Sequence, residues 1–202
     1  MVLKNFIVFE GIDGAGTSTQ IKKIVESDPQ KFVATAEPTG LPTGKFLRKM
    51  LGGEFQVDEK TNACLFAADR CEHIFGKGGV KELCESGKTV VSDRYFFSSL
   101  AYQSVSCGLE LPMLLNSQFP LPEYLFFFEI NPEVSLARVN SRNESKEIYE
   151  NIEAQKKIAA LYEKVISMYE TDQSKREEMK IIRIDATKSI EEIAQIIKSE
   201  IK

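Results

Sequence analysis

Short apolar runs recur along the chain, and longer segments with helical spacing separate them. Five runs have the length and nearly continuous apolar character of buried strands: residues 6–9, 32–34, 89–91, 124–130 and 181–184. Helical spacing is clearest near the end of the chain, in the series Ile190, Ile193, Ile197 and Ile201. Strands that alternate with helices predict a parallel sheet covered on both faces. We therefore expect one α/β domain that spans residues 1–202.

The composition and charge exclude several classes of protein. With 43% hydrophobic and 28% charged residues, the 202-residue chain resembles a globular protein with a substantial core. Its net charge of −4 argues against a broad nucleic-acid surface, so no nucleic-acid partner is expected. The chain has no apolar run of 18 residues and leads directly into a strand-like segment. We therefore expect a cytoplasmic protein with neither a membrane span nor a signal peptide.

Cysteine and histidine offer little material for a metal site. The four cysteines form no C-x-x-C pair, and His73 is the single histidine. We interpret Cys64, Cys71, Cys84 and Cys107 as reduced residues in or near the core. We interpret His73 as an ordinary helix residue.

A glycine-rich segment follows the first predicted strand. From Gly11 the chain reads G-I-D-G-A-G-T-S-T, which fits the phosphate-loop pattern G-x-x-x-x-G-K-[ST] except that Thr17 replaces the lysine. Glycines permit close backbone approach, and the amides of a helix N-terminus bind anions. A strand-to-helix turn whose serine and threonine cap the helix is the alternative interpretation. The candidate phosphate-binding residues are Gly11, Ile12, Asp13, Gly14, Ala15, Gly16, Thr17, Ser18 and Thr19.

A second polar segment, S-D-R-Y-F-F-S-S-L-A-Y-Q at residues 92–103, follows the third predicted strand. In a parallel sheet, ligands bind beyond the carboxyl ends of the strands, so Asp93 and Arg94 should lie on the same edge as the glycine-rich loop. Ser18 and Asp93 are the candidate ligands of Mg²⁺, because it prefers hydroxyl, carboxylate and water oxygens. Arg94 could bind a phosphate with two hydrogen bonds. An ordinary Asp–Arg ion pair is the alternative.

Six segments, taken in order, resemble the thymidylate kinase family. They are FEGIDGAG-x-STQ, EPTGLPTGKFLRKML, LFAADRCEH, SDRYFFSSLAYQ, KEIYENIEAQKK and IDATKSIEEI. The resemblance implies the nucleoside monophosphate kinase fold, with a phosphate loop and a five-stranded parallel sheet flanked by helices. It also implies transfer of the γ-phosphoryl group of ATP, with Mg²⁺, to dTMP, which gives dTDP and ADP. A homodimer is implied by the resemblance alone.

The resemblance implies roles for residues on the acceptor side. Phe66 and Arg70 are four positions apart, hence on one helix face, and in the family this pair stacks on thymine and hydrogen-bonds its edge. Arg94 resembles the arginine that bridges the acceptor and the transferred phosphate. Local alternatives stay open, such as a core phenylalanine beside a surface arginine. The expected dTMP-binding residues are Asp13, Arg48, Phe66, Arg70, Arg94, Ser98, Tyr102, Gln103 and Tyr149.

Residues 138–149 resemble the lid that closes over ATP in the family. The segment is rich in charged residues, which elsewhere are more often plain solvated surface. Tyr149 matches a tyrosine that closes on the sugar. The expected catalytic residues are Arg94, Asp93, Arg142 and Arg138.

Near the end of the chain, I-D-A-T-K resembles the strand and loop that border the adenine. The expected adenine-side residues are Asp185, Ala186 and Thr187. In the alternative interpretation, Asp185 and Thr187 only cap the last helix.

The phosphate loop departs from the family at a position that carries charge. Loss of one preorganised charge-stabilising donor commonly costs on the order of 10²–10³ in kcat, so Thr17 predicts a slow enzyme that still binds ATP. Gly14 occupies a position where one branch of the family has an arginine. Our hypothesis is that Arg142 or Arg138 partly supplies the missing charge.

Two alternatives to an active thymidylate kinase follow from the same residues. One is a homologue that binds nucleotides with impaired catalysis, which Thr17 favours. The other is a kinase of the same fold that acts on another nucleoside or nucleotide. The acceptor-side residues, with the SDRY and AYQ segments, favour dTMP.

Overall fold

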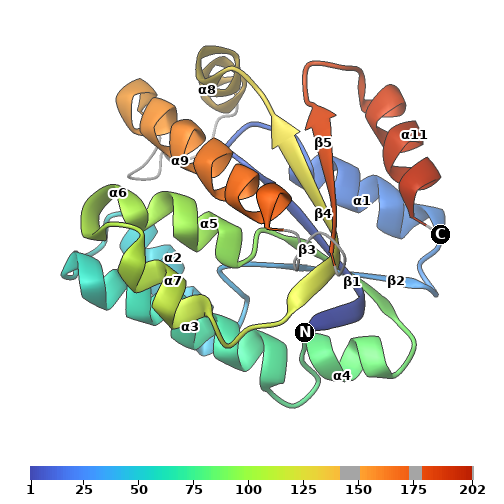
Figure 1. Ribbon diagram of the computed structural model, residues 1–202, viewed down its shortest axis with the longest axis horizontal. Coiled ribbons are helices and arrows are strands. Elements are labelled where there is room, and N and C mark those ends of the chain that lie inside the picture. The colour runs from blue at the N-terminus through green and yellow to red at the C-terminus, as the bar shows by residue number, and fades with distance from the viewer. Residues whose placement is uncertain (142–150, 173–178, 202) are drawn as a thin grey trace.

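A five-stranded parallel sheet forms the centre of the computed structural model, which describes residues 1–141, 151–172 and 179–201 (Figure 1). Each strand pairs in parallel with its neighbours, in the order β2-β3-β1-β4-β5. The strands are β1 (Val2–Gly11), β2 (Phe32–Ala36), β3 (Thr89–Asp93), β4 (Leu121–Glu129) and β5 (Lys180–Asp185). All five predicted strands are confirmed, and so is the α/β fold class.

Helices cover both faces of the sheet, which explains why the strands are apolar throughout. In β1, neighbouring side chains alternate between two apolar clusters, with Phe6 and Val8 in one and Ile7 and Phe9 in the other. All four are at most 1% exposed. Register pairs Phe9 with Asp93 of β3, so these two strands end on the same edge of the sheet.

The helices divide between the two faces. Apolar residues of α1 and α11 pack on the face that carries Ile7, whereas α3, α4, α5 and α9 cover the face that carries Phe6 (Figure 1). The described helices are α1 (Thr17–Ser27), α2 (Pro42–Leu51), α3 (Glu59–Phe75), α4 (Val80–Glu85), α5 (Phe96–Tyr102), α6 (Ser104–Cys107), α7 (Glu110–Asn116), α8 (Pro132–Asn140), α9 (Ile152–Thr171) and α11 (Ile190–Glu200).

The cysteines are less buried than expected. Cys84 is buried and Cys107 is half-buried, but Cys64 and Cys71 are exposed on α3, so the prediction was wrong for that pair. The four thiols are free. Within the described residues, no group of three or more histidine, cysteine, aspartate or glutamate side chains could hold a metal ion. The described helices include none long and apolar enough to cross a membrane.

Candidate active site

A tight loop joins β1 to α1 at the carboxyl end of the central strand. Gly14 and Gly16 have φ values of +86° and +96°, a region that glycine enters without strain. A Cβ atom on Gly14 would lie 2.6 Å from the carbonyl oxygen of Ser135 in α8. The arginine that one family branch has at this position therefore does not fit here. Because α1 begins at Thr17 without a side-chain cap, its first N–H groups are free to bind an anion.

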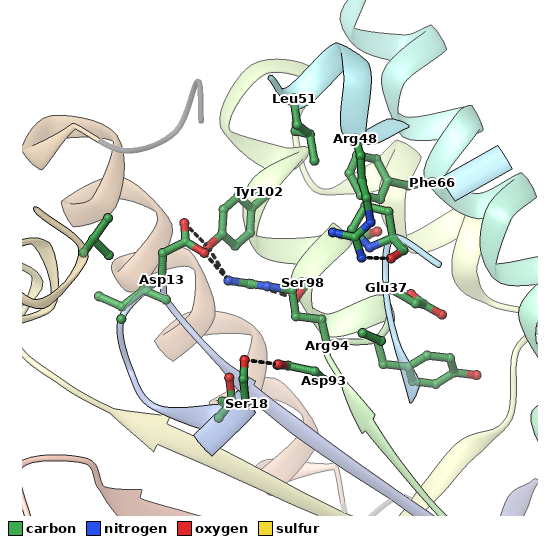
Figure 2. A pocket seen from close by; sticks show the side chains of 18 of the residues that line it. Asp13, Ser18, Glu37, Arg48, Leu51, Phe66, Asp93, Arg94, Ser98 and Tyr102 are labelled. Atoms are coloured by element: carbon green, nitrogen blue, oxygen red, sulfur yellow. Dashed lines mark hydrogen bonds and ion pairs between the residues drawn. The ribbon is translucent and has the colours of Figure 1, made fainter. Parts of the chain in front are cut away.

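The loop forms one wall of a cavity of about 300 Å³, and residues from α2, α3 and α5 form other parts of its lining. Figure 2 shows Asp13 and Ser18 on one side of this cavity, with Arg48, Leu51 and Phe66 on the other. The sequence-predicted residues that line it are Ile12, Asp13, Gly14, Gly16, Thr17, Ser18, Thr19, Arg48, Phe66, Arg70, Asp93, Arg94, Ser98, Tyr102 and Gln103.

Other predicted residues lie away from this lining or cannot be placed. Arg142 and Tyr149 fall outside the described residues, as does most of the expected lid. The predicted residues outside the lining are Gly11, Ala15, Arg138, Asp185, Ala186 and Thr187.

Ser18 and Asp93, the two candidate metal ligands, meet where the loop faces the end of β3. The Ser18 hydroxyl donates a hydrogen bond to Oδ2 of Asp93 at 2.5 Å (Figure 2). Both residues line the cavity next to the N-terminus of α1. One hydroxyl and one carboxylate suit Mg²⁺, which commonly uses one or two protein oxygens together with substrate phosphates and water.

Arg94 occupies the centre of the site, with its guanidinium fixed from several sides. Its backbone φ is +71°, unusual for a residue with a side chain, and its N–H donates to the carbonyl oxygen of Phe9 at 2.9 Å. The guanidinium forms an ion pair with Asp13 and donates to the Tyr102 hydroxyl at 3.1 Å (Figure 2). Burial alone would lower the pKa of Arg94, but Tyr102 and Asp13 raise it well above its usual value. Arg94 is therefore a permanent cation.

Arg70 is a second fixed cation, held on the α3 side of the cavity. Its guanidinium forms a salt bridge of 2.6 Å with Glu37, and the two side chains are 1% and 3% exposed. It also donates to Asn116 Oδ1 and, at 3.1 Å, to Ser99 Oγ. The other carboxylate oxygen of Glu37 lies 2.9 Å from Nδ1 of His73. Arg70 is therefore oriented before any ligand binds.

Arg48 and Phe66 complete this wall (Figure 2). Arg48 belongs to α2 and donates to the carbonyl oxygen of Pro38. Phe66, one helical turn before Arg70 in α3, is half-buried against an α2 cluster that includes Leu51. The structure thus brings an aromatic ring and two guanidinium groups to one wall.

Comparison with known proteins gives the family. A sequence model described as "Thymidylate kinase" matches residues 9–197. The chain belongs to the thymidylate kinase family. A relative from Treponema pallidum (strain Nichols) is 39% identical over 198 residues, which covers 97% of this chain and 94% of the relative. A thymidylate kinase from Leptospira interrogans (serovar copenhageni, strain Fiocruz L1-130) is 37% identical over 196 residues, which covers 94% of this chain and 90% of that protein.

In this thymidylate kinase family member, Arg138 lies behind the glycine-rich loop between β1 and α1. Its guanidinium donates to the carbonyl oxygens of Ala186, at 3.0 Å, and Gly14, at 3.4 Å. The side chain thus joins the glycine-rich loop to the segment after β5 without lining the cavity.

The expected adenine-side loop is held by internal hydrogen bonds. Asp185 accepts from the backbone N–H of Thr187 at 2.9 Å and from its hydroxyl at 2.6 Å. The cap of α11 is Ser189, which forms a capping box with Glu192. The alternative in which Asp185 and Thr187 cap this helix was therefore wrong.

The sequence reasoning missed several polar residues that hold the site in place. Glu10 and Glu37 are buried carboxyl groups, whereas Asn116 and Tyr162 come from helices far along the chain. One signal was present: Glu10 is a carboxylate in an otherwise apolar strand, and a buried charge requires partners.

Proposed function

We propose that the protein transfers the γ-phosphoryl group of ATP to dTMP and releases dTDP and ADP. The observation that carries the proposal is the position of Arg94, a fixed cation in the cavity that the phosphate loop shares with Phe66 and Arg70. Phosphoryl transfer depends mainly on positioning and on neutralising charge, so a cation between donor and acceptor suits it. The names of the Leptospira relatives support dTMP as the acceptor.

On the donor side, the N–H groups at the start of α1 would bind the phosphates of ATP. Ser18 and Asp93 would hold Mg²⁺ together with phosphate oxygens and water. When bound, the ion supplies positive charge that neutralises the phosphate oxygens. The loop glycines let the backbone approach the phosphates closely.

On the acceptor side, each proposed role matches the chemistry of the side chain. Phe66 offers a ring face on which thymine can stack, and Arg70 offers a planar set of donors already oriented by Glu37. Arg48 and Arg94 would bind the dTMP phosphate, with Asp13 near the sugar. Arg94 then stays in contact with the phosphoryl group as it moves, because its guanidinium is held in place.

This mechanism needs another positive charge, because Thr17 replaces the lysine of the phosphate-loop pattern. In the described part of the cavity lining the cations are Arg48, Arg70 and Arg94, and no lysine is present. Arg138 is engaged by two backbone carbonyl groups. The proposed compensation therefore rests on Arg142, within the proposed lid at residues 138–149.

We further propose a cytoplasmic homodimer of single-domain chains without a nucleic-acid partner. Exposed apolar side chains on α2, α3 and α7 support an association surface: Phe46 is 43% exposed, Phe75 47% and Leu114 69%. Sedimentation velocity on wild type and on Leu114→Glu tests this surface. A wild-type protein that sediments as a monomer at micromolar concentration would contradict the dimer.

One assay separates the candidate functions. ADP release is coupled to a spectroscopic readout, with ATP and Mg²⁺ against dTMP, dUMP, dCMP and thymidine. We expect turnover that is fastest with dTMP. Binding of dTMP without turnover would instead indicate an impaired nucleotide-binding homologue, and a preference for thymidine or dCMP would indicate a different kinase of this fold.

A further inference from the structure

Glu10 lies beneath the site and makes no part of the cavity lining among the described residues. It belongs to β1, immediately before the phosphate loop, and its side chain is fully buried. One carboxylate oxygen accepts from the backbone N–H groups of Tyr95, at 2.8 Å, and Ser98, at 3.1 Å. The other accepts from the hydroxyls of Ser98, at 2.6 Å, and Tyr162, at 2.8 Å. Four donors thus converge on one carboxylate.

The same two hydroxyls face Arg94 on their other side. Nη1 of Arg94 donates to the Ser98 oxygen at 3.2 Å and to the Tyr162 oxygen at 3.1 Å. Since a hydroxyl carries one proton, donation to Glu10 leaves its lone pairs available to the guanidinium. A carboxylate on one side and a guanidinium on the other therefore fix the direction of both hydroxyl protons.

The guanidinium of Arg94 is held at both ends. Nη2 forms the ion pair with Asp13 and donates to Tyr102, whereas Nη1 meets the two hydroxyls that Glu10 orients. Both terminal nitrogens therefore have two acceptors each, and this fixes the plane of the guanidinium. Losing the acceptors at one end would leave it free to rotate about its contact with Asp13.

We propose that Glu10 is a positioning residue for phosphoryl transfer, which acts through Ser98 and Tyr162 to hold Arg94 against the acceptor phosphate. This inference rests on the proposed function and deepens it. It also gives Ser98 a role different from the expected contact with dTMP, because its hydroxyl already donates to Glu10 and accepts from Arg94.

The ionised form of Glu10 is the one that fits this network. If Glu10 were protonated, the oxygen that accepts from Ser98 and Tyr162 would carry a proton and donate it. One of the two hydroxyls would then have to accept from Glu10 instead of donating to it. Burial raises the pKa of Glu10 to about 7, while the contacts with Ser98, Arg94, Tyr162 and the Tyr95 N–H oppose that rise. Asp13 and Tyr102, the other titratable groups nearby, contact Arg94 on its far side from Glu10's hydroxyl partners. The network is therefore complete above about pH 7 and partly reversed below it.

The central experiment compares Glu10→Gln and Tyr162→Phe with wild type. We expect Glu10→Gln to lower kcat/KM for dTMP by about 10- to 100-fold, because a buried charged acceptor is lost, and Tyr162→Phe by about 3- to 10-fold. The KM for ATP should change by less than about twofold, since the donor-side amides are untouched. In the double variant the two losses should be less than multiplicative, because both act through Arg94.

Tyr169→Phe is the matched control. Tyr169 lies two turns further along α9 and packs against Phe96 and Phe97, away from Arg94. Removal of its hydroxyl should leave kcat/KM for dTMP within about twofold of wild type.

Binding measurements separate this proposal from the proposed function. By calorimetry, Glu10→Gln should weaken dTMP binding about tenfold or more yet leave thymidine binding unchanged, because thymidine lacks the phosphate that Arg94 contacts. A wild type that binds dTMP without turnover would refute the function but leave this comparison intact. If Glu10→Gln and Tyr162→Phe lower only the melting temperature, or weaken dTMP and thymidine equally, Glu10 is structural and the proposal fails. Should Glu10→Gln not fold, Tyr162→Phe alone decides.

Discussion

The salt bridge between Glu37 and Arg70 offers a direct test of how the proposed acceptor side is built. Replacement of Glu37 by alanine would remove the carboxylate that pairs with the Arg70 guanidinium, whose side chain is 1% exposed. Removing one partner of a buried pair costs about 3–5 kcal/mol, because the remaining charge stays buried. In a chain of this size each kcal/mol lowers the melting temperature by about 2–4 °C, so a decrease of about 6–20 °C is expected.

An exposed ion pair provides the control for this change. Glu191 pairs with Lys23 at 2.7 Å, but their side chains are 78% and 39% exposed. Glu191→Ala should therefore cost about 0–1 kcal/mol. Both variants are compared by urea unfolding and by differential scanning calorimetry at pH 8.

Activity supplies the second measurement on Glu37→Ala. Assayed well below its melting temperature, the variant should show a raised KM for dTMP and an unchanged KM for ATP, because Arg70 lies on the acceptor wall only. The reasoning is refuted if Glu37→Ala and Glu191→Ala lose similar amounts of stability. It is also refuted if the KM for ATP rises as much as that for dTMP.

Three further predictions concern the phosphate loop and Glu10. If Arg142 compensates for Thr17, Arg142→Ala should lower kcat by about 10²–10³, and Thr17→Lys should raise kcat by less than about tenfold. A large gain in kcat from Thr17→Lys, with no loss from Arg142→Ala, would contradict compensation. Gly14→Ala should lower the free energy of unfolding by about 1–3 kcal/mol more than Gly16→Ala. Both positions have positive φ, but only at Gly14 would the added Cβ meet backbone, at 2.6 Å. Equal melting temperatures of the two variants would contradict this. The folded-state pKa of Glu10, about 7 against 4.5 for the free group, means that the folded state binds this proton more tightly. The stabilisation from the proton on Glu10 is complete below pH 4.5 and is lost as the pH rises through 7. In a urea-unfolding series between pH 4.5 and 7, the wild type should therefore lose stability relative to Glu10→Gln.

The sheet and the glycine-rich loop after β1 could be predicted because their signals are local in the sequence. A strand buried on both faces is apolar at every position, and glycines at fixed spacing mark the loop. The rule that ligands bind at the carboxyl ends of parallel strands predicts Asp93 on the same edge as this loop, where it contacts Ser18.

The support beneath the site could not be predicted in this way. Glu10 and Tyr162 are 152 positions apart, and their hydrogen bond depends on how α9 crosses the sheet. Glu37 likewise precedes Arg70 by 33 positions and joins it only when the turn after β2 meets α3. The spacing of side chains on one helix gives no information about such contacts. Ser98 shows the consequence: it lines the cavity as a predicted site residue should, but no feature of the sequence indicates that its hydroxyl bonds to Glu10 and Arg94.

The strand order has a consequence for how the molecule opens. The glycine-rich loop leaves β1, which has a neighbour on each side and is buried over its last six residues. The turn that carries Glu37 leaves β2, an edge strand whose residues are only half-buried or exposed. Local opening needs less free energy where fewer contacts must break. The backbone N–H groups of β2 should therefore exchange with solvent through partial openings, while those in the buried part of β1 exchange only when the whole chain unfolds.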